Sequence, residues 1–316
     1  MANNFNFTLT SGNVMHSLGF GTYAPQHGEE EVLKAVRAAI KAGYRHLDCA
    51  AIYRNERAVG QALKQLIVES TITRKDIFVT SKLWNTCHKP ELVRSSLKKS
   101  LDDLGLSYLD LYLMHWPMGY QEGGEFLPRG EDGNVLYSDV DFVDTWKALE
   151  DCVDEGLVKD IGLSNFNKQQ IERILEIARI KPSNNQIECH IHLSNAKLIE
   201  FCKSKNISVT AYSPLGAPGN KTVSHTPPLE EPVIKELASK KNKTPSQILI
   251  RFLLQRGLAV IPKSVTPSRI VENFQVFDFD LSEDEMSQIT TLNKDYRLST
   301  EDIALKHKYY PFYDEF

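Results

Sequence analysis

KPELVRSSLKKSLDDLGLSYLDLYLMHW, residues 89–116, holds the pattern that decides the fold of this chain. Its first part repeats apolar residues at helical spacing, and Gly105 is a typical helix stop. The predicted inward stripe consists of Leu92, Ser96, Leu97 and Leu101. Its second part, YLDLYLMHW (108–116), is a nearly continuous apolar run, which is typical of a parallel strand covered on both faces. Together they predict one repeat of a parallel α/β fold.

The same alternation extends along the chain in both directions. Seven further strands are predicted at LGFGT (18–22), YRHLD (44–48), IFVTSKL (77–83), KDIGLSN (159–165), NNQIECH (184–190), SVTAYSP (208–214) and AVIPKS (259–264). Helices are predicted at 29–43, 143–156, 167–178, 194–205 and 231–256, and a charged helix is expected after Tyr53. Eight strand–helix units favour a closed (β/α)8 TIM barrel, forming a single domain over residues 1–316. An open doubly wound sheet is the alternative.

Four segments fall outside this repeat. The opening residues 5–20 suggest a small N-terminal hairpin that turns at Ser11-Gly12-Asn13. Two long connections, 117–142 and 215–230, follow predicted strands and are rich in Gly, Pro and polar residues, so we expect long loops at the C-terminal face of the barrel. The C-terminal tail, ending HKYYPFYDEF, is aromatic and is expected to pack back on the body.

Bulk composition limits the class of protein. The chain is 41% apolar and 25% charged with a net charge of -4, which argues against nucleic acid or an anionic membrane as a partner. No apolar run approaches the roughly 20 residues that span a bilayer, and the start shows no signal peptide. Five scattered cysteines without a C-x-x-C pair fit reduced thiols, so a cytoplasmic protein is expected.

Polar residues stand at the ends of seven predicted strands. They are Asp48, Lys82, His115, Ser164 with Asn165, Gln186, Tyr212 with Ser213, and Lys263 with Ser264. In a parallel barrel all these ends lie on one face, where such barrels carry their active sites. The sequence therefore predicts that this face is the functional one.

The residue types narrow the chemistry. No metal is expected, because Lys82 beside Asp48 and His115 would repel a cation, and His190 and His192 stand near a loop. No G-x-S-x-G motif supports a serine hydrolase, and Cys49 should face the core. A tyrosine, a lysine, an aspartate and a histidine suit proton donation, because an ammonium lowers the pKa of a phenol and a carboxylate holds the ammonium.

Proton donation to a carbonyl pairs naturally with hydride delivery, which needs a nicotinamide carrier. GFGTYA (19–24) formally matches G-x-G-x-x-A, but Pro25 and Gly28 follow where a helix should open, so it is a poor Rossmann motif. IPKSVTPSRIVENF (261–274) is the better phosphate candidate. It combines two cations, hydroxyls and a helix start near Pro267.

These motifs resemble those of the aldo-keto reductase superfamily. GYRHLDCA with Glu56, Val59 and Gly60, the strand LYLMHWP, DIGLSNF (160–166), NQIECH (185–190) and IPKSVTPSR followed by Glu272 and Asn273 are similar to the family's motifs, over nearly the whole chain. The resemblance implies a barrel that binds NADPH across its strand ends and reduces an aldehyde or ketone, most simply as a monomer. An NADPH-binding scaffold with little turnover is the alternative.

The resemblance also implies roles for individual residues. Tyr53 is expected as general acid, Lys82 and Asp48 to tune it, and His115 to orient the carbonyl. The cofactor contacts implied are Thr22, Tyr23, Asp48, Ser164, Asn165, Gln186, Tyr212, Ser213, Leu215, Lys263, Ser264, Val265, Thr266, Arg269, Glu272 and Asn273. Among these, Lys263, Ser264, Thr266 and Arg269 match the family residues that bind the 2′-phosphate, the group that distinguishes NADPH from NADH.

The substrate is less well determined. The expected pocket consists of Tyr23, Trp84, His115, Trp116, Phe126 and Leu127, with Tyr309 or Tyr310 from the tail. Three positions depart from the family pattern: Tyr23 replaces a common Trp, Leu127 replaces an aromatic, and HIHL (190–193) replaces a His-Pro-Tyr run. Sugar aldehydes, lipid aldehydes, steroid-like ketones and quinones all remain open.

Overall fold

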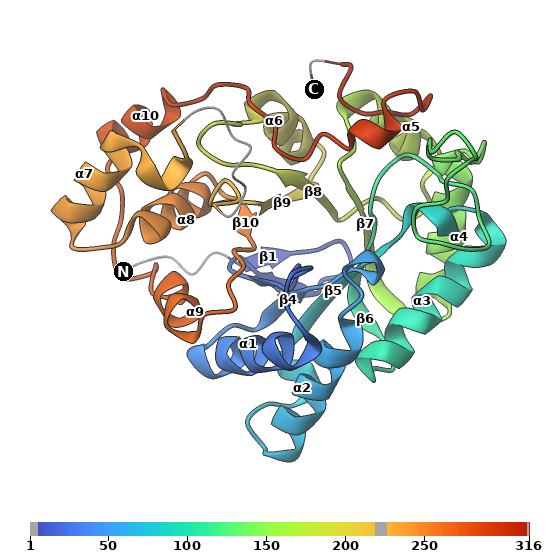
Figure 1. Ribbon diagram of the computed structural model, residues 1–316, viewed down its shortest axis with the longest axis horizontal. Helices are drawn as coiled ribbons and strands as arrows, with labels where there is room; N and C mark the ends of the chain where they lie inside the picture. Colours follow the sequence, from blue (N-terminus) through green and yellow to red (C-terminus); the bar gives the residue numbers. More distant parts are fainter. Residues whose placement is uncertain (1–5, 219–225, 315) are drawn as a thin grey trace.

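Eight parallel strands form a closed barrel in the computed structural model, which describes residues 6–218, 226–314 and 316 (Figure 1). The strands are β3 (Phe20–Gly21), β4 (His46–Asp48), β5 (Phe78–Leu83), β6 (Leu109–Met114), β7 (Val158–Ser164), β8 (Asn184–Glu188), β9 (Ser208–Tyr212) and β10 (Ala259–Val260). They are hydrogen-bonded in the order β10-β9-β8-β7-β6-β5-β4-β3. The barrel closes where Gly19 N donates to Val260 O at 2.9 Å and Gly21 N donates to Pro262 O at 3.1 Å. The predicted barrel and all eight predicted strands are confirmed.

Helices surround the strands, as Figure 1 shows. Their bounds are α1 (Glu29–Ala42), α2 (Glu56–Val68), α3 (Pro90–Leu104), α4 (Phe142–Asp154), α5 (Lys168–Ile177), α6 (Ala196–Ser204), α7 (Pro232–Lys241), α8 (Pro245–Gln255), α9 (Pro267–Phe274) and α10 (Glu283–Thr290). The single helix predicted over 231–256 was wrong, because the chain forms two helices there. Asn242 ends α7 in the left-handed conformation (φ 52°), and Thr244 and Pro245 begin α8.

Helix α3 follows directly from its sequence. Pro90 occupies its first turn, and Gly105 ends it with φ 65°, in the left-handed region that glycine adopts without strain. Its buried face is Val93, Leu97, Ser100, Leu101 and Leu104. The observed buried face is therefore rotated slightly from the predicted stripe, because Leu92 and Ser96 are only half-buried.

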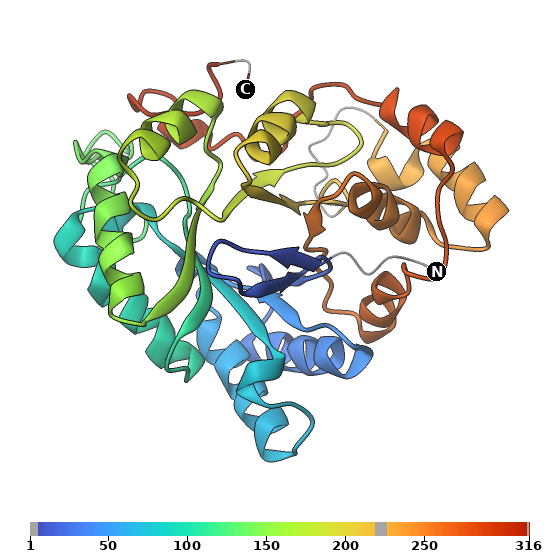
Figure 2. The same cartoon turned by 180° about the vertical axis from the view of Figure 1, so that it is seen from behind.

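The N-terminal hairpin lies across the amino end of the barrel strands (Figure 2). Strands β1 (Asn6–Thr8) and β2 (Val14–His16) pair antiparallel. The buried carboxylate of Asp160 anchors the turn by accepting hydrogen bonds from Thr10 Oγ1 (3.2 Å) and Ser11 N (3.1 Å). The predicted hairpin is confirmed over residues 6–16, and its expected start at residue 5 lies outside the described residues.

The first long loop, the described parts of the second and the tail occupy the opposite end. Residues 117–142 and the tail share an apolar cluster of Trp84, Trp116, Met118, Tyr120, Val135, Ala304 and Tyr310. Tyr309 also donates to Asp141 Oδ2 at 2.8 Å, so the tail packs back on the body as expected. Residues 219–225 of the second loop lie outside the described residues. None of the helices described is long and apolar enough to cross a membrane.

Candidate active site

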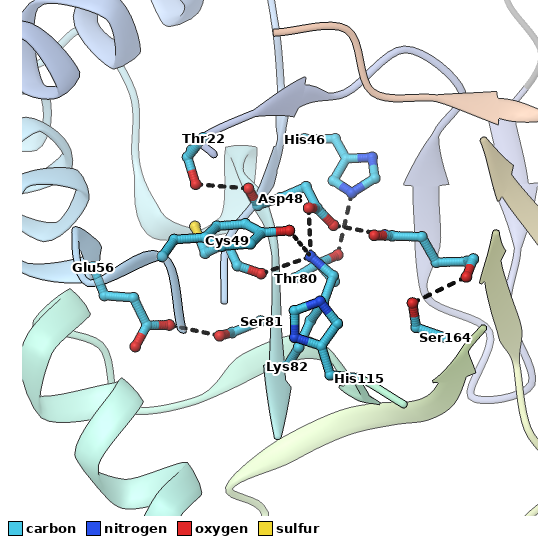
Figure 3. Close-up of polar contacts among 12 residues, drawn as sticks. Thr22, His46, Asp48, Cys49, Glu56, Thr80, Ser81, Lys82, His115 and Ser164 are labelled. Atoms are coloured by element: carbon cyan, nitrogen blue, oxygen red, sulfur yellow. Dashed lines mark hydrogen bonds and ion pairs between the residues drawn. The ribbon is translucent and has the colours of Figure 1, made fainter. Parts of the chain in front are cut away.

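The polar strand ends converge at the carboxyl end of the barrel, and Figure 3 shows Asp48, Lys82 and His115 together there. Side chains alternate along a strand, so Asp48 points inward while its neighbour Cys49 packs into the core outside the barrel. Lys82 Nζ donates to Asp48 Oδ1 at 2.5 Å and to the backbone oxygen of Cys49 at 2.9 Å. Both side chains of this ion pair are buried, with exposed fractions of 0% and 2%.

Tyr53 reaches the pair from a separate short turn. It ends the 3-10 helix Ala51–Tyr53, where Arg54 turns the chain with φ 56°. Lys82 Nζ donates to the Tyr53 hydroxyl at 3.3 Å, and the Tyr53 ring lies 6.0 Å from that of His115. The structure thus brings together the four residues expected to be catalytic.

Two opposing effects set the pKa of Tyr53. Burial raises its pKa to about 12, and the Lys82 ammonium offsets only part of that shift. The expected effect of Lys82, to lower the pKa of the phenol, is present, but removal of water from around the hydroxyl outweighs it. For Lys82, burial favours the neutral amine, but Asp48 and Tyr53 outweigh it and raise the pKa. At neutral pH the site therefore holds a neutral phenol beside an ammonium.

His115, like Tyr53, is uncharged at neutral pH. Burial holds its pKa well below the usual value, and Lys82 and His88 lower it further. Its ring lies 5.4 Å from the Trp84 ring, edge to face. An uncharged imidazole here can donate one hydrogen bond without placing a second cation beside Lys82.

Amide and hydroxyl groups of Ser164, Asn165, Gln186 and Tyr212 lie beside the ion pair. Gln186 Nε2 donates to Asp48 Oδ2 at 2.7 Å, and Ser164 Oγ donates to the backbone oxygen of Gln186 at 3.0 Å. Asn165, with φ 63°, donates to the backbone oxygen of His115 at 3.0 Å and accepts from the Tyr212 hydroxyl at 2.9 Å. The hydrogen bond to Asn165 holds the Tyr212 ring beside these polar groups, and the ring offers a flat apolar surface.

Four more of the expected cofactor contacts lie nearby and come from two loops. Thr22 Oγ1 donates to the backbone oxygen of Asp48 at 2.8 Å, and Tyr23 is 55% exposed beside Tyr53, with ring centroids 5.0 Å apart. On the other loop Ser213 has φ 51° and Leu215 is half-buried. All four lie at the same strand ends as the buried ion pair.

The expected phosphate segment follows β10 and opens α9. Lys263 and Arg269 are exposed, and neither forms an ion pair with a carboxylate among the described residues. Thr266 N donates to Ser264 Oγ at 3.1 Å, with half-buried Val265 between them. Unpaired cations beside hydroxyls and the start of a helix fit a phosphate group.

The two residues expected on the adenine side differ from each other. Glu272 already accepts a hydrogen bond from Thr244 Oγ1 at 2.9 Å, so one of its oxygens serves the contact between α8 and α9. Asn273 is 4% exposed, and its buried Oδ1 has no partner among the described residues. Asn273 is thus the better placed of the two to bind a ligand.

The expected substrate pocket is only partly assembled from the expected residues. Trp84 and Trp116 are buried at its wall, and Trp84 Nε1 donates to the backbone oxygen of Phe126 at 2.6 Å. Leu127 and Tyr23 are exposed at the same end of the barrel. Tyr309 turns away to pack on Phe142 at 4.9 Å.

Tyr310, the other tail residue expected, lies in the same aromatic cluster as Trp84 and Trp116. Phe312 contacts Trp116 at 5.8 Å and Tyr310 at 5.5 Å. Phe312 was missed from the sequence, although the dense aromatic spacing of the tail was a signal for it.

The histidines weighed as metal ligands have other partners. His190 Nε2 lies 2.7 Å from Glu188 Oε1, and His192 Nε2 lies 2.7 Å from Glu231 Oε1. Among residues 6–218, 226–314 and 316, no three His, Cys, Asp or Glu side chains are grouped to hold a metal.

Comparison with known proteins agrees with this geometry. A family model described as "Aldo/keto reductase family" matches residues 17–294. The chain is 48% identical to aldo-keto reductase family 1 member A1-A of Danio rerio, over 98% of each chain. It is 47% identical to prostaglandin-E(2) 9-reductase of Oryctolagus cuniculus, over 98% of this chain and 97% of that one. The solved aldose reductase of Schistosoma japonicum superposes with a TM-score of 0.93 at 47% identity, covering 99% of this chain and 100% of that one. The chain belongs to the aldo/keto reductase family.

Proposed function

We propose that this protein catalyses the NADPH-dependent reduction of an aldehyde or ketone to the alcohol. The observation that carries the proposal is the buried Asp48–Lys82–Tyr53 chain of contacts beside neutral His115. Tyr53 is a protonated acid at neutral pH, and Lys82 stabilises the phenolate that remains after proton transfer. Asp48 keeps Lys82 charged and in place, and His115 orients the carbonyl oxygen toward the phenol.

The surrounding groups support NADPH as the cofactor. Bound NADPH supplies the hydride to the carbonyl carbon. Ser164, Asn165 and Gln186 offer amide and hydroxyl groups for the nicotinamide carboxamide, and Tyr212 offers a ring face. The unpaired cations Lys263 and Arg269 support a preference for NADPH over NADH, since only NADPH carries a 2′-phosphate for them to bind.

The relatives do not select one substrate for this chain, because one is named for prostaglandin E2 and another as an aldose reductase. The aromatic wall of Trp84, Trp116 and Phe312 favours carbonyl compounds with an apolar body. We further propose that the enzyme is monomeric and lies in the cytoplasm; the five free thiols support the location.

Loss of NADPH absorbance tests the proposal, using an aromatic aldehyde, an aldose, an α-dicarbonyl and a ketosteroid, with NADH in parallel. We expect turnover of at least one carbonyl compound and a preference for NADPH. Tight NADPH binding without turnover of any compound would instead point to a cofactor-binding scaffold.

A further inference from the structure

A carboxylate lies against the aromatic wall of the expected substrate pocket. Glu301, in the tail, is half-buried, and its Oε1 accepts a hydrogen bond from the Tyr120 hydroxyl at 2.7 Å. Tyr120 is 0% exposed and belongs to the apolar cluster that also contains Trp84 and Trp116. Because an ionised group is costly to bury among apolar side chains, a carboxylate at this position points to a function.

Hydrogen bonds and ring contacts hold this part of the tail against both ends of the wall. At one end, the Tyr120 ring lies 6.0 Å from the Trp84 ring, edge to face. At the other end, the Tyr310 hydroxyl donates to the backbone oxygen of Thr300 at 2.6 Å. The Tyr310 ring in turn lies 5.5 Å from that of Phe312. This part of the tail is therefore anchored beside two rings of the proposed pocket wall.

The backbone fixes the place of the carboxylate. Glu301 has φ 51°, in the left-handed region that residues other than glycine adopt with strain. Its backbone oxygen accepts a hydrogen bond from Ala304 N at 2.8 Å, and Ala304 is 0% exposed in the same apolar cluster. Because such a conformation persists only where its surroundings impose it, the packing of the tail holds Glu301 in this position.

The hydroxyl that meets Glu301 stays protonated. Burial raises the pKa of Tyr120 well above its usual value, Glu301 adds to that shift, and a side-chain hydrogen bond with Asn85 opposes it. For Glu301, burial raises the pKa, the hydrogen bond from Tyr120 lowers it and Asp302 raises it. Tyr120 is therefore a fixed donor that favours the ionised form of Glu301.

The second oxygen of this carboxylate is available to a ligand. Within the described part of the chain, Glu301 forms no ion pair and its Oε2 accepts no hydrogen bond. Oε2 is also not among the fully buried atoms that lack a partner, so it is open to solvent or to a ligand. Two arginines near the same rings stack on them instead: Arg54 lies over Phe126 at 4.7 Å and Arg297 over Phe312 at 3.7 Å. The described side chains therefore leave the charge of Glu301 unpaired.

We propose that Glu301 is a specificity-determining residue of the substrate pocket, favouring carbonyl compounds that carry an ammonium or hydroxyl group away from the carbonyl and disfavouring those with an anionic group there. The inference rests on the proposed function, because it concerns the compound that the site reduces. A hydrogen bond between an ionised acceptor and an ammonium is about twice as strong as a neutral one. A second carboxylate in the same place would instead be repelled.

The test uses three benzaldehydes of nearly equal size, substituted para or meta to the aldehyde with a dimethylaminomethyl, an isobutyl or a carboxymethyl group. These substituents are cationic, neutral and anionic at neutral pH. We expect the wild type to prefer the cationic compound to the anionic one in kcat/KM, with the neutral compound between them. Glu301→Gln keeps the size of the side chain and an acceptor for Tyr120. It should lower the ratio of cationic to anionic kcat/KM about tenfold or more.

A matched control removes one negative charge elsewhere. Glu236→Gln, at an exposed position of α7, should leave that ratio unchanged. A wild type that prefers the carboxymethyl compound would overturn the inference, as would an unchanged ratio in folded Glu301→Gln or an equal fall in Glu236→Gln. Melting temperatures check that each variant is folded.

Calorimetry with NADP+ gives a readout that does not need turnover, because NADP+ carries no hydride to transfer. The Kd values of the three aldehydes should follow the same order in the wild type and converge in Glu301→Gln. If the wild type reduces none of the aldehydes, the proposed function fails, while the order of the Kd values still decides this inference. Turnover with equal kcat/KM for all three compounds would keep the proposed function and refute the role of Glu301.

Discussion

Replacing Lys82 with methionine should destabilise the protein by an amount that depends on pH. Lys82 is 0% exposed and is the cationic partner of Asp48 at 2.5 Å. In the variant, the Asp48 carboxylate keeps the hydrogen bond from Gln186 Nε2 at 2.7 Å but loses its counter-charge. Breaking one side of a buried ion pair costs about 3–5 kcal/mol.

Protonation of Asp48 sets a ceiling on that cost. A buried carboxylate without its counter-charge can escape the penalty by taking up a proton, and that uptake costs more free energy as the pH rises above about 3.9, the usual value for an unfolded aspartate, so the penalty grows as pH rises. At pH 7 the cost of carrying the proton is about 1.36 kcal/mol for each of about 3 pH units, or about 4 kcal/mol. At pH 5 the same ceiling is about 1.5 kcal/mol. We therefore expect a penalty of about 3–4 kcal/mol at pH 7 that falls below about 2 kcal/mol at pH 5.

Urea unfolding of wild type and Lys82→Met at both pH values measures this difference. The double variant Asp48→Asn/Lys82→Met removes both charges and should recover most of the lost stability at pH 7. Lys34→Met removes an exposed ion pair with Glu30 and should leave stability unchanged. Equal penalties at pH 5 and pH 7, or a penalty below about 1 kcal/mol at pH 7, would refute the reasoning.

Three further outcomes are expected. Burial lowers the pKa of His46 to about 4, so only the unfolded chain takes up its proton between pH 6.5 and 4. His46 should therefore steepen the fall in unfolding free energy by about 1.4 kcal/mol per pH unit in that window, and a His46→Phe variant with an unchanged slope would contradict this. Gly60→Ala should cost about 1–3 kcal/mol in thermal unfolding, because its Cβ would lie 2.6 Å from the backbone oxygens of Asp103 and Leu104. Gly124→Ala meets no atom within 4 Å and should be neutral, so similar losses in both variants would argue against the clash. Arg269→Ala should weaken NADPH binding about tenfold or more while sparing NADH, as measured by fluorescence titration, and an equal loss for both would exclude a role in reading the 2′-phosphate.

The barrel could be predicted because its strands carry two independent signals. Each strand is a short apolar run, which predicts burial on both faces. Most of them end in a polar residue, which is typical of the functional face of a parallel barrel. The break between α7 and α8 has a sequence signal in Pro245, because proline disrupts the interior of a helix but is favourable at its first position. Helix α10 was missed although Ser282 and Glu285 form a capping box at its start.

The candidate site was predictable in position but not in its electrostatics. Parallel register alone brings Asp48 and Lys82 to the same end of the barrel. The raised pKa of Tyr53 could not be predicted, because its burial depends on Tyr23, His115 and other residues distant in the sequence. The turning away of Tyr309 toward Asp141 likewise depends on how the tail crosses α4, which no local pattern specifies.

The most direct test of the proposed chemistry is a comparison of wild type with Tyr53→Phe, in which NADPH affinity and carbonyl turnover are measured on the same samples. The phenyl ring keeps its place beside Tyr23 and His115 and loses only the hydroxyl that Lys82 contacts at 3.3 Å. We expect NADPH to bind with nearly unchanged affinity and carbonyl reduction to be lost. Retained turnover in Tyr53→Phe would contradict the assignment of Tyr53 as the proton donor.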